Sequence, residues 1–180
     1  MEYLPICLTV FLWFLLVLAD CKMEVQYHRV ENVQNSSMAV SNIWVAKINL
    51  NQHGLRGNIT FLKDIGNNYL LFTEIYHSSL GNNQFTRTPY KLPILGICDF
   101  NSYMLNEYRD YLEDVIENLP LDNECPIGAR ALVVKDVIFD SNAWPQQGRP
   151  GLWKVEMKIV EALTSTNILE LHFYINVYDY

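Results

Sequence analysis

The chain has little positive charge and no cluster of it. Its 180 residues include 13 lysines and arginines against 20 aspartates and glutamates, for a net charge of −7. A mildly acidic chain without a Lys/Arg cluster has no electrostatic footprint for nucleic acid and none for an anionic lipid surface. We therefore expect no nucleic-acid partner. Low-complexity tracts and internal repeats are also missing, which favours one ordinary globular domain.

The sequence also lacks the motifs of a catalyst. It has no Gly-x-Ser-x-Gly motif, no cysteine beside a plausible base and no glycine-rich phosphate loop. Acidic residues at 113, 114 and 117 have the spacing of an exposed helix face. We expect no enzymatic activity, no metal and no cofactor. The histidines share no ligand spacing, and two of them fall on polar strand faces, where solvation is their ordinary state; the four are His28, His53, His77 and His172.

The longest apolar run lies at the N-terminus. Residues 4–18 carry no charge, match the core of a signal peptide and fall short of the roughly 20 residues that a bilayer-spanning helix needs. Small residues stand at the two positions that a signal peptidase reads, which predicts cleavage before Asp20. A basic n-region is missing, so an uncleaved signal anchor is the alternative. We expect residues 1–19 to be a signal peptide and residues 20–180 one secreted domain, without stable membrane insertion once the leader is removed.

Secretion would decide what the cysteines do, because disulfides persist in oxidising compartments. Cys7 would leave with the leader, and the best remaining pair is Cys98 with Cys125. Cys21 would then be left over. It is lost if cleavage falls slightly later, stays free, or pairs between chains.

Two glycosylation sequons follow from the same compartment, Asn35-Ser36-Ser37 and Asn58-Ile59-Thr60. The second lies in a predicted strand, where successive side chains point to opposite faces. A glycan on Asn58 must face water, so Ile59 and Phe61 must face inward.

Most of the chain alternates with the period of two that is typical of strands, between turns rich in Asn, Gly and Ser. The 11 tyrosines and 8 phenylalanines agree, because aromatic side chains favour pleated surfaces. The pattern predicts about eight strands in two antiparallel sheets, a mainly β sandwich or cup with one inserted helix. Three segments carry the alternation most plainly, and we expect their apolar positions to face inward: 44–50, 153–159 and 169–177.

Between Asn101 and Leu119 the apolar period switches to 3.6, which predicts the helix. Asp99 or Asn101 would cap its start, and Pro120 would stop it. The Cys98–Cys125 pair would bracket this helix and fix both of its ends against the sheets. One stripe of the helix is apolar: Leu105, Tyr108, Leu112, Val115, Ile116 and Leu119.

The apolar residues expected to face inward fit two kinds of interior. A solid core is the ordinary one, whereas a hollow interior between two sheets would make a pocket for an apolar ligand. Composition does not separate them, because the same residues serve both. An empty apolar space on the order of several hundred Å³ would favour a ligand.

A set of local features resembles a known family. They are Leu92-Pro93-Ile94, Cys98 with the amphipathic helix, Cys125-Pro126, and the strand start at residues 150–155. Together they resemble the insect CheA/CheB chemosensory proteins, small secreted proteins similar to the ganglioside-activator (ML-like) type of lipid-recognition domain. The resemblance covers most of the mature chain.

The resemblance implies a cup, splayed at one end, that holds a lipid or a pheromone-like hydrocarbon. It also implies secretion around taste or pheromone-sensing hairs, modulation of chemosensory responses, and a chemosensory receptor or channel as a partner. We expect the ligand to contact inward residues of the strands and of the helix: Trp44, Ile48, Ile59, Phe61, Leu112, Val115, Trp153, Val155, Met157, Leu171, Phe173 and Ile175.

The alternative is a secreted interaction protein with a filled core and no ligand, which acts as a cofactor for a receptor or channel. It would bind its partner through exposed aromatic side chains such as Tyr174, Tyr178 and Tyr180.

Overall fold

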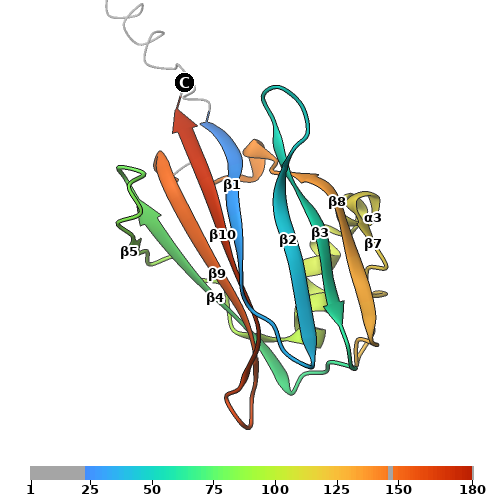
Figure 1. Ribbon diagram of the computed structural model, residues 1–180. Coiled ribbons are helices and arrows are strands. Elements are labelled where there is room, and N and C mark those ends of the chain that lie inside the picture. Colours follow the sequence, from blue (N-terminus) through green and yellow to red (C-terminus); the bar gives the residue numbers. More distant parts are fainter. Residues whose placement is uncertain (1–22, 146–147, 180) are drawn as a thin grey trace, which may run out of the picture.

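Two antiparallel sheets face each other in the computed structural model, which describes residues 23–145 and 148–179 (Figure 1). The larger sheet has the order β1-β10-β9-β4-β5, with β6 paired to β4. Its strands are β1 (Met23–Gln34), β4 (Tyr69–Ser78), β5 (Thr86–Arg87), β6 (Leu95–Gly96), β9 (Gly151–Glu161) and β10 (Asn167–Asp179). The smaller sheet has the order β2-β3-β8-β7. Its strands are β2 (Ala39–Lys47), β3 (His53–Phe61), β7 (Ile116–Glu117) and β8 (Arg130–Ile138).

This architecture confirms the predicted fold class, a mainly β sandwich or cup with an inserted helical segment. The sheets diverge toward the end of the molecule at which β10 ends (Figure 1). None of the helices within the described ranges is long and apolar enough to cross a membrane. The expected signal peptide, with Cys7, lies outside the described residues, and so do Cys21 and Tyr180.

Asparagine side chains join the two sheets along one side, where the chain passes from β1 to β2. Asn32 replaces a strand partner for Ile43: its Nδ2 donates to the Ile43 carbonyl at 2.9 Å, and its Oδ1 accepts from the Ile43 N–H at 3.1 Å. Asn35 accepts from the Ser41 N–H at 2.7 Å. These bonds hold the edges of the sheets together here, so any opening between the sheets must lie elsewhere.

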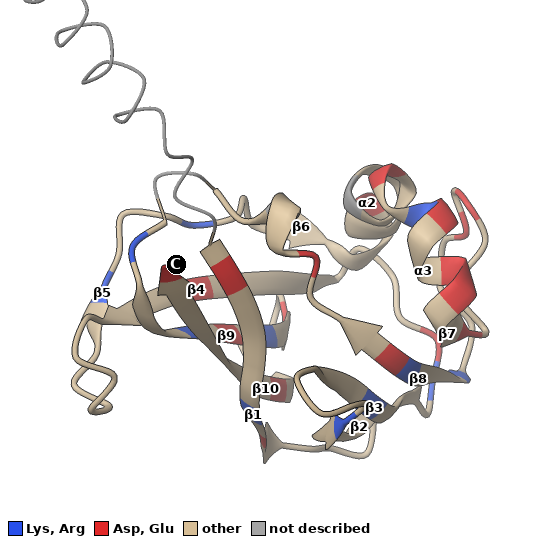
Figure 2. Cartoon of the chain, turned by 90° about the horizontal axis from the view of Figure 1, so that it is seen from above, with Lys and Arg blue, Asp and Glu red and all other residues tan. Residues whose placement is uncertain are grey.

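The helical segment covers the opposite side, from the β6 edge of the larger sheet to the β7 edge of the smaller one (Figure 2). It consists of α2 (Ile97–Phe100), a π-helical stretch (Asn101–Leu105) and α3 (Arg109–Val115), with a break at Tyr108, where φ is −110°. The sequence prediction of one helix from Asn101 to Leu119 is therefore correct in type and wrong at both ends.

Tertiary contacts explain the wrong helix ends. Asn101 does not cap the helix but lies inside it, fully buried, and its Nδ2 donates to the Leu121 carbonyl at 2.8 Å. Pro120 does not stop the helix either, because α3 ends at Val115. The next residue, Ile116, pairs with Val134 as the first residue of β7. The helix thus ends where the chain begins to pair with the edge of β8, four residues before Pro120 is reached.

The interior holds two separate clusters of apolar side chains. The lower cluster, at the narrow end, comprises Ala39, Phe61, Ile65, Tyr69, Leu71, Ile97, Ile127, Ile159, Ile168 and Leu169. The upper cluster, at the splayed end, comprises Val25, Trp153, Ile175 and Val177.

The predicted face of β2 is wrong. Ser41 and Ile43 point inward and are buried, whereas Trp44 points outward and is 46% exposed. The run Ile43–Ala46 is apolar without interruption, so its pattern fits either face. Pairing decides the face, because Ser41 lies opposite the inward Ile59.

Candidate ligand-binding cavity

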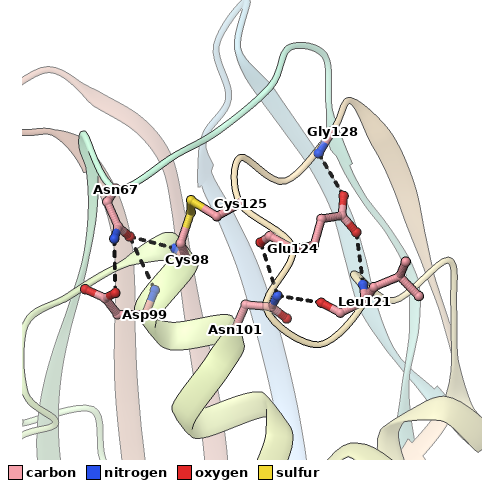
Figure 3. Close-up of a disulfide and its surroundings, with 8 residues drawn as sticks. All are labelled: Asn67, Cys98, Asp99, Asn101, Leu121, Glu124, Cys125 and Gly128. Carbon is pink, nitrogen blue, oxygen red and sulfur yellow. Dashed lines mark hydrogen bonds between the residues drawn. A yellow bond between two sulfur atoms is a disulfide. The ribbon is translucent and has the colours of Figure 1, made fainter.

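The helical segment is fixed at its start by a disulfide and by an asparagine from another part of the chain (Figure 3). Cys98 and Cys125 form the predicted disulfide, with their Cα atoms 5.4 Å apart. Asn67, in the loop before β4, accepts hydrogen bonds from the backbone N–H groups of Cys98 at 2.9 Å and Asp99 at 3.3 Å. Asn67 thus satisfies N–H groups that a helix start leaves without partners, and the helix cannot easily leave the side of the sandwich.

A cavity of about 150 Å³ lies where this segment meets the two sheets; we call it the chamber. Every side chain that lines it is apolar, so it has no group that would orient a polar ligand or transfer a proton. The larger sheet supplies Leu71, Met157, Ile159, Leu169 and Leu171, and the smaller sheet supplies Ile59, Phe61, Leu132 and Ile116. The helical segment and the loops supply Ile97, Phe100, Leu105, Leu119, Pro120 and Ile127.

A second, more open cavity of about 650 Å³ lies beside α3 and the end of β8; we call it the mouth cavity. Three tyrosines give it an amphipathic wall. The Tyr111 hydroxyl donates to the Ile138 carbonyl at 2.8 Å, and burial raises the pKa of Tyr27. The lining residues are Tyr27, Tyr108, Tyr111, Leu112, Val137, Ile138, Phe139 and Asp140.

Residues of the apolar stripe predicted for the helix line both cavities. Leu105 lines the chamber, while Tyr108 and Leu112 line the mouth cavity. Leu105 ends the π-helical stretch, Tyr108 lies at the break and Leu112 lies in α3. Both parts of the helical segment therefore contribute to the cavities, Leu105 to the chamber and Tyr108 and Leu112 to the mouth cavity.

Between the two interior clusters, one row of the larger sheet is incompletely covered. Phe173 pairs with Val30 on one side and with Val155 on the other, and Val155 pairs with Ile75. All four side chains are half-buried, although Leu171 and Ile175, two residues before and after Phe173 on the same face, are buried. Closely packed sheets would bury the whole row. This row is therefore less completely covered than the residues on either side of it.

The chamber contains four of the twelve residues expected to contact a ligand, Ile59, Phe61, Met157 and Leu171. Leu112 lines the mouth cavity instead. The inward position of Ile59 and Phe61 agrees with the outward position expected of Asn58, which is half-buried on the outer face of β3.

The other expected contacts lie elsewhere. Trp153 and Ile175 belong to the upper cluster, with Val155 packed beside it. Phe173 is in the half-buried row. Trp44 is on the outer face of the smaller sheet, and Ile48 follows β2 in the hairpin, against Gly54. Val115 ends α3, half-buried, and lines neither cavity.

Sequence reasoning missed the part of the chamber wall made by Ile97, Phe100 and Ile127. These residues lie in the helix start and in the loop that the disulfide brings together. Periodicity carries no signal for them, because their proximity depends on a covalent bond and on the cap from Asn67. Leu105, Ile116 and Leu119 were part of the apolar stripe, so a signal for them was present.

The tyrosine surface of the alternative hypothesis is only partly exposed. Tyr174 is 6% exposed, donates from its hydroxyl to Glu31 Oε2 at 2.8 Å, and is covered by the Arg29 guanidinium 3.6 Å from its ring centroid. Tyr178 is 45% exposed. The expectation that Tyr174 is an exposed contact is therefore wrong.

Ionisable side chains gather on the outer face of the larger sheet rather than in a cavity. Ligand atoms of Glu156, Glu170 and His172 lie within 4.8 Å of one another. Lysines neutralise both carboxylates: Lys154 Nζ lies 2.6 Å from Glu156, and Lys158 Nζ lies 3.3 Å from Glu170. His172 lies 2.8 Å from Glu170 and is half-buried, so the solvated state expected for it is wrong. The cluster is an ion-pair network.

Comparison with known proteins adds no assignment. No family model matches the chain, and no curated protein matches it significantly.

Proposed function

We propose that this protein is a secreted carrier or presenter of a hydrophobic molecule and that it modulates chemosensory responses as a non-enzymatic binding protein. The observation that carries the proposal is the chamber, whose lining is apolar throughout. The resemblance to the CheA/CheB and ML-like proteins suggests the chemosensory role and the class of ligand, a lipid or a pheromone-like hydrocarbon. A receptor or channel is the proposed protein partner.

The physical mechanism is burial of an aliphatic chain. Each methylene that leaves water contributes about 0.8 kcal/mol. An apolar cavity near 150 Å³ can hold a guest the size of benzene, so the chamber itself accommodates about six carbons and contributes about 5 kcal/mol before entropy losses.

A longer ligand needs more room than the chamber provides. The chamber is smaller than the several hundred Å³ between the sheets that would favour a ligand over a packed core. The mouth cavity is larger, at about 650 Å³, but it lies beside α3 and is more open. We place the apolar end of the ligand in the chamber and its polar end near the hydroxyl groups of Tyr108 and Tyr111. In this arrangement Leu105 contacts the chain at the chamber, and Tyr108 and Leu112 contact it in the mouth cavity.

Mass spectrometry of the native protein tests this proposal. The full chain, produced in insect secretory cells, should release a lipid or hydrocarbon into organic solvent, and a fluorescent fatty acid should bind with micromolar affinity or better. Recordings from taste hairs with and without added protein would then test the chemosensory role. A protein that is empty after extraction and that binds no fluorescent fatty acid would contradict ligand transport.

A further inference from the structure

A groove of about 530 Å³ crosses the outer face of the smaller sheet, on the side away from the chamber. Strand pairing places its main residues. Asn42 lies opposite Asn58, and Trp44 lies opposite Arg56. Trp44 and Asn58 are therefore diagonal neighbours on one face, a separation that an aromatic side chain can reach across.

A glycine in the strand that floors the groove allows the Trp44 ring to lie close to the backbone. Gly57 has a φ of +124°, a conformation that other residues rarely adopt. A Cβ at Gly57 would stand 2.9 Å from Cζ3 of the indole and 1.9 Å from the Asn42 carbonyl oxygen. Only glycine lets the Trp44 ring lie this close to the sheet. The ring is held in place and is still 46% exposed.

Charged side chains form the other wall of the groove. Arg56 forms a two-point ion pair with Asp136, whose second contact joins Nη2 to Oδ2 at 2.9 Å. Such a pair supplies donors and acceptors without net charge. Lys135 also lines the groove, and its charge is paired with Glu117. The groove thus combines one apolar aromatic surface with ion-paired polar groups, which suits an uncharged ligand with one apolar face and many hydroxyls.

The groove also contains a residue to which such a ligand, a sugar, can be attached covalently. Asn58 begins the sequon Asn58-Ile59-Thr60, and its Nδ2 donates to Thr60 Oγ1 at 3.2 Å. Asn58 is one of the residues that line the groove beside Trp44. A sugar attached to its Nδ2 would start within the groove.

We propose that Asn58 carries an N-linked glycan and that its first N-acetylglucosamine packs on the Trp44 indole in this groove. In the attachment step, the Asn58 amide nitrogen forms a bond to C1 of an oligosaccharide donated by a polyprenyl diphosphate. The bond from C1 to the diphosphate oxygen breaks, the polyprenyl diphosphate leaves, and the proton lost by the amide nitrogen passes to solvent. The C–H face of the sugar then covers the exposed indole, while its hydroxyl and acetamido groups meet Arg56, Asp136 and Asn42. Tryptophan suits this contact because it combines a large apolar surface with an edge that tolerates water.

The second sequon provides an internal comparison. Asn35 lies at the β1–β2 connection, where its side chain bonds to the backbone and hydroxyl of Ser41. It does not line the groove. A glycan on Asn35 is therefore expected to have no contact with Trp44.

The inference depends on passage through the secretory pathway, as the proposed function does, but it needs no ligand in the chamber. The experiment therefore uses the full chain in insect cells, with a second arm in which a leader of proven cleavage replaces the first residues. If the protein binds no fatty acid but Asn58 is glycosylated, only the carrier proposal fails. If Asn58 stays bare while fatty acid binds, only this inference fails.

Peptide mass spectrometry should find glycan at Asn58 in the parent protein and in Thr60→Ser, and none at Asn58 in Thr60→Ala. With isotope-labelled sugars, nuclear Overhauser contacts should connect the N-acetyl methyl group to the indole protons. Enzymatic removal of the glycan should lower the melting temperature by about 2–4 °C. In Trp44→Ala this difference should fall to less than half. Leu50→Ala, an exposed change in the same hairpin, should leave it intact.

Several results would overturn the inference. One is an unmodified Asn58 in secreted protein from either arm. Another is a glycan with no contact to the indole, together with equal effects of its removal in parent and Trp44→Ala protein. A dimer that forms through Trp44 in sedimentation experiments on glycosylated protein would also contradict it, because the groove would then hold a second copy.

Discussion

The side chain of Asn67 accepts a hydrogen bond from the backbone N–H of Cys98 at 2.9 Å, and it thereby fixes the helical segment to a loop that lies far away in the sequence. The contact requires Gly96, because a Cβ there would stand 2.3 Å from Asn67 Oδ1. Cys98 is held a second time by its disulfide to Cys125. Two independent attachments therefore meet at the start of the segment that walls the chamber.

Loss of the cap should weaken the fold without changing its architecture. Asn67→Ala leaves the N–H groups of Cys98 and Asp99 without their acceptor and should lower the free energy of unfolding by about 1–2 kcal/mol. Urea denaturation followed by tryptophan fluorescence measures this. Asn68→Ala is the matched control, because Asn68 is exposed and contacts Ala162 through its backbone carbonyl rather than its side chain. Equal losses in the two variants would contradict a capping role for Asn67.

Loss of the disulfide should cost more. Cys98 and Cys125 are 27 residues apart, and opening a loop of this size should lower the free energy of unfolding by about 3–4 kcal/mol in the chain-entropy model. The double variant Cys98→Ala/Cys125→Ala should therefore unfold at much lower denaturant concentration than oxidised parent protein. Reduced parent protein should match the variant. A variant as stable as the oxidised parent would contradict this prediction.

The sequence predicted those parts of the fold in which local pattern and tertiary structure agree. In β10, apolar residues alternate with polar ones, and Leu171 and Ile175 are buried as expected. In β3, the sequon fixed Asn58 outward and Phe61 inward, and Phe61 is buried. Each of these strands has one polar face, so only one register satisfies the pattern.

The sequence does not predict the inward face of a segment that is apolar on both faces. It also does not predict secondary structure that depends on pairing with a residue far away in the chain. Trp44 lies in an unbroken apolar run, and its outward position follows from the pairing of β2 with β3, where Gly57 leaves room for the ring. Ile116 continues the helical stripe, but it pairs with Val134 of β8. Neither Gly57 nor Val134 can be recognised as a partner from the local sequence.

The chamber was the least predictable feature. Its residues are ordinary core residues, and its existence depends on the distance between the sheets and on where the helix lies. Ile59 and Met157 were expected at a cavity because they point inward, which is equally true of Ile175 in the packed upper cluster. Alternation along a strand shows which side chains point inward, but it does not show whether the space between them is filled or empty.

Filling the chamber should separate an empty space from a packed core. Leu132→Phe adds volume at a side chain that lines the chamber. The ring can occupy existing space, so we expect the free energy of unfolding to change by less than about 1 kcal/mol. The affinity for a fluorescent fatty acid should fall by about tenfold or more, because the guest and the ring compete for the same volume.

The control is Ile65→Phe. Ile65 is fully buried in the lower cluster and does not line the chamber. Overpacking there should lower the free energy of unfolding by about 1–3 kcal/mol. If Leu132→Phe destabilises the protein as much as Ile65→Phe, the space around Leu132 is not available to a guest.

The ion-pair network on the outer face should make the protein sensitive to acid. Burial raises the pKa of Glu156, but the hydrogen bond and charge of Lys154, with the charges of His172 and Lys158, outweigh it and hold that pKa below its usual value of 4.5. Burial and the partners His172 and Lys158 have the same net effect on the pKa of Glu170. A carboxyl group with a lowered folded-state pKa stabilises the fold above its unfolded-state pKa, and this stabilisation is lost as pH falls through the folded-state pKa.

The free energy of unfolding should therefore decrease between about pH 5 and pH 3, which denaturant titrations at several pH values would measure. Glu156→Gln should lower it by about 1–2 kcal/mol at neutral pH, because Lys154 loses a charged acceptor, and should reduce the decrease in acid. Glu107→Gln, on the exposed surface of the helical segment, should leave both quantities unchanged. An acid dependence that is equally steep in Glu156→Gln and in the parent would show that other carboxyl groups control it.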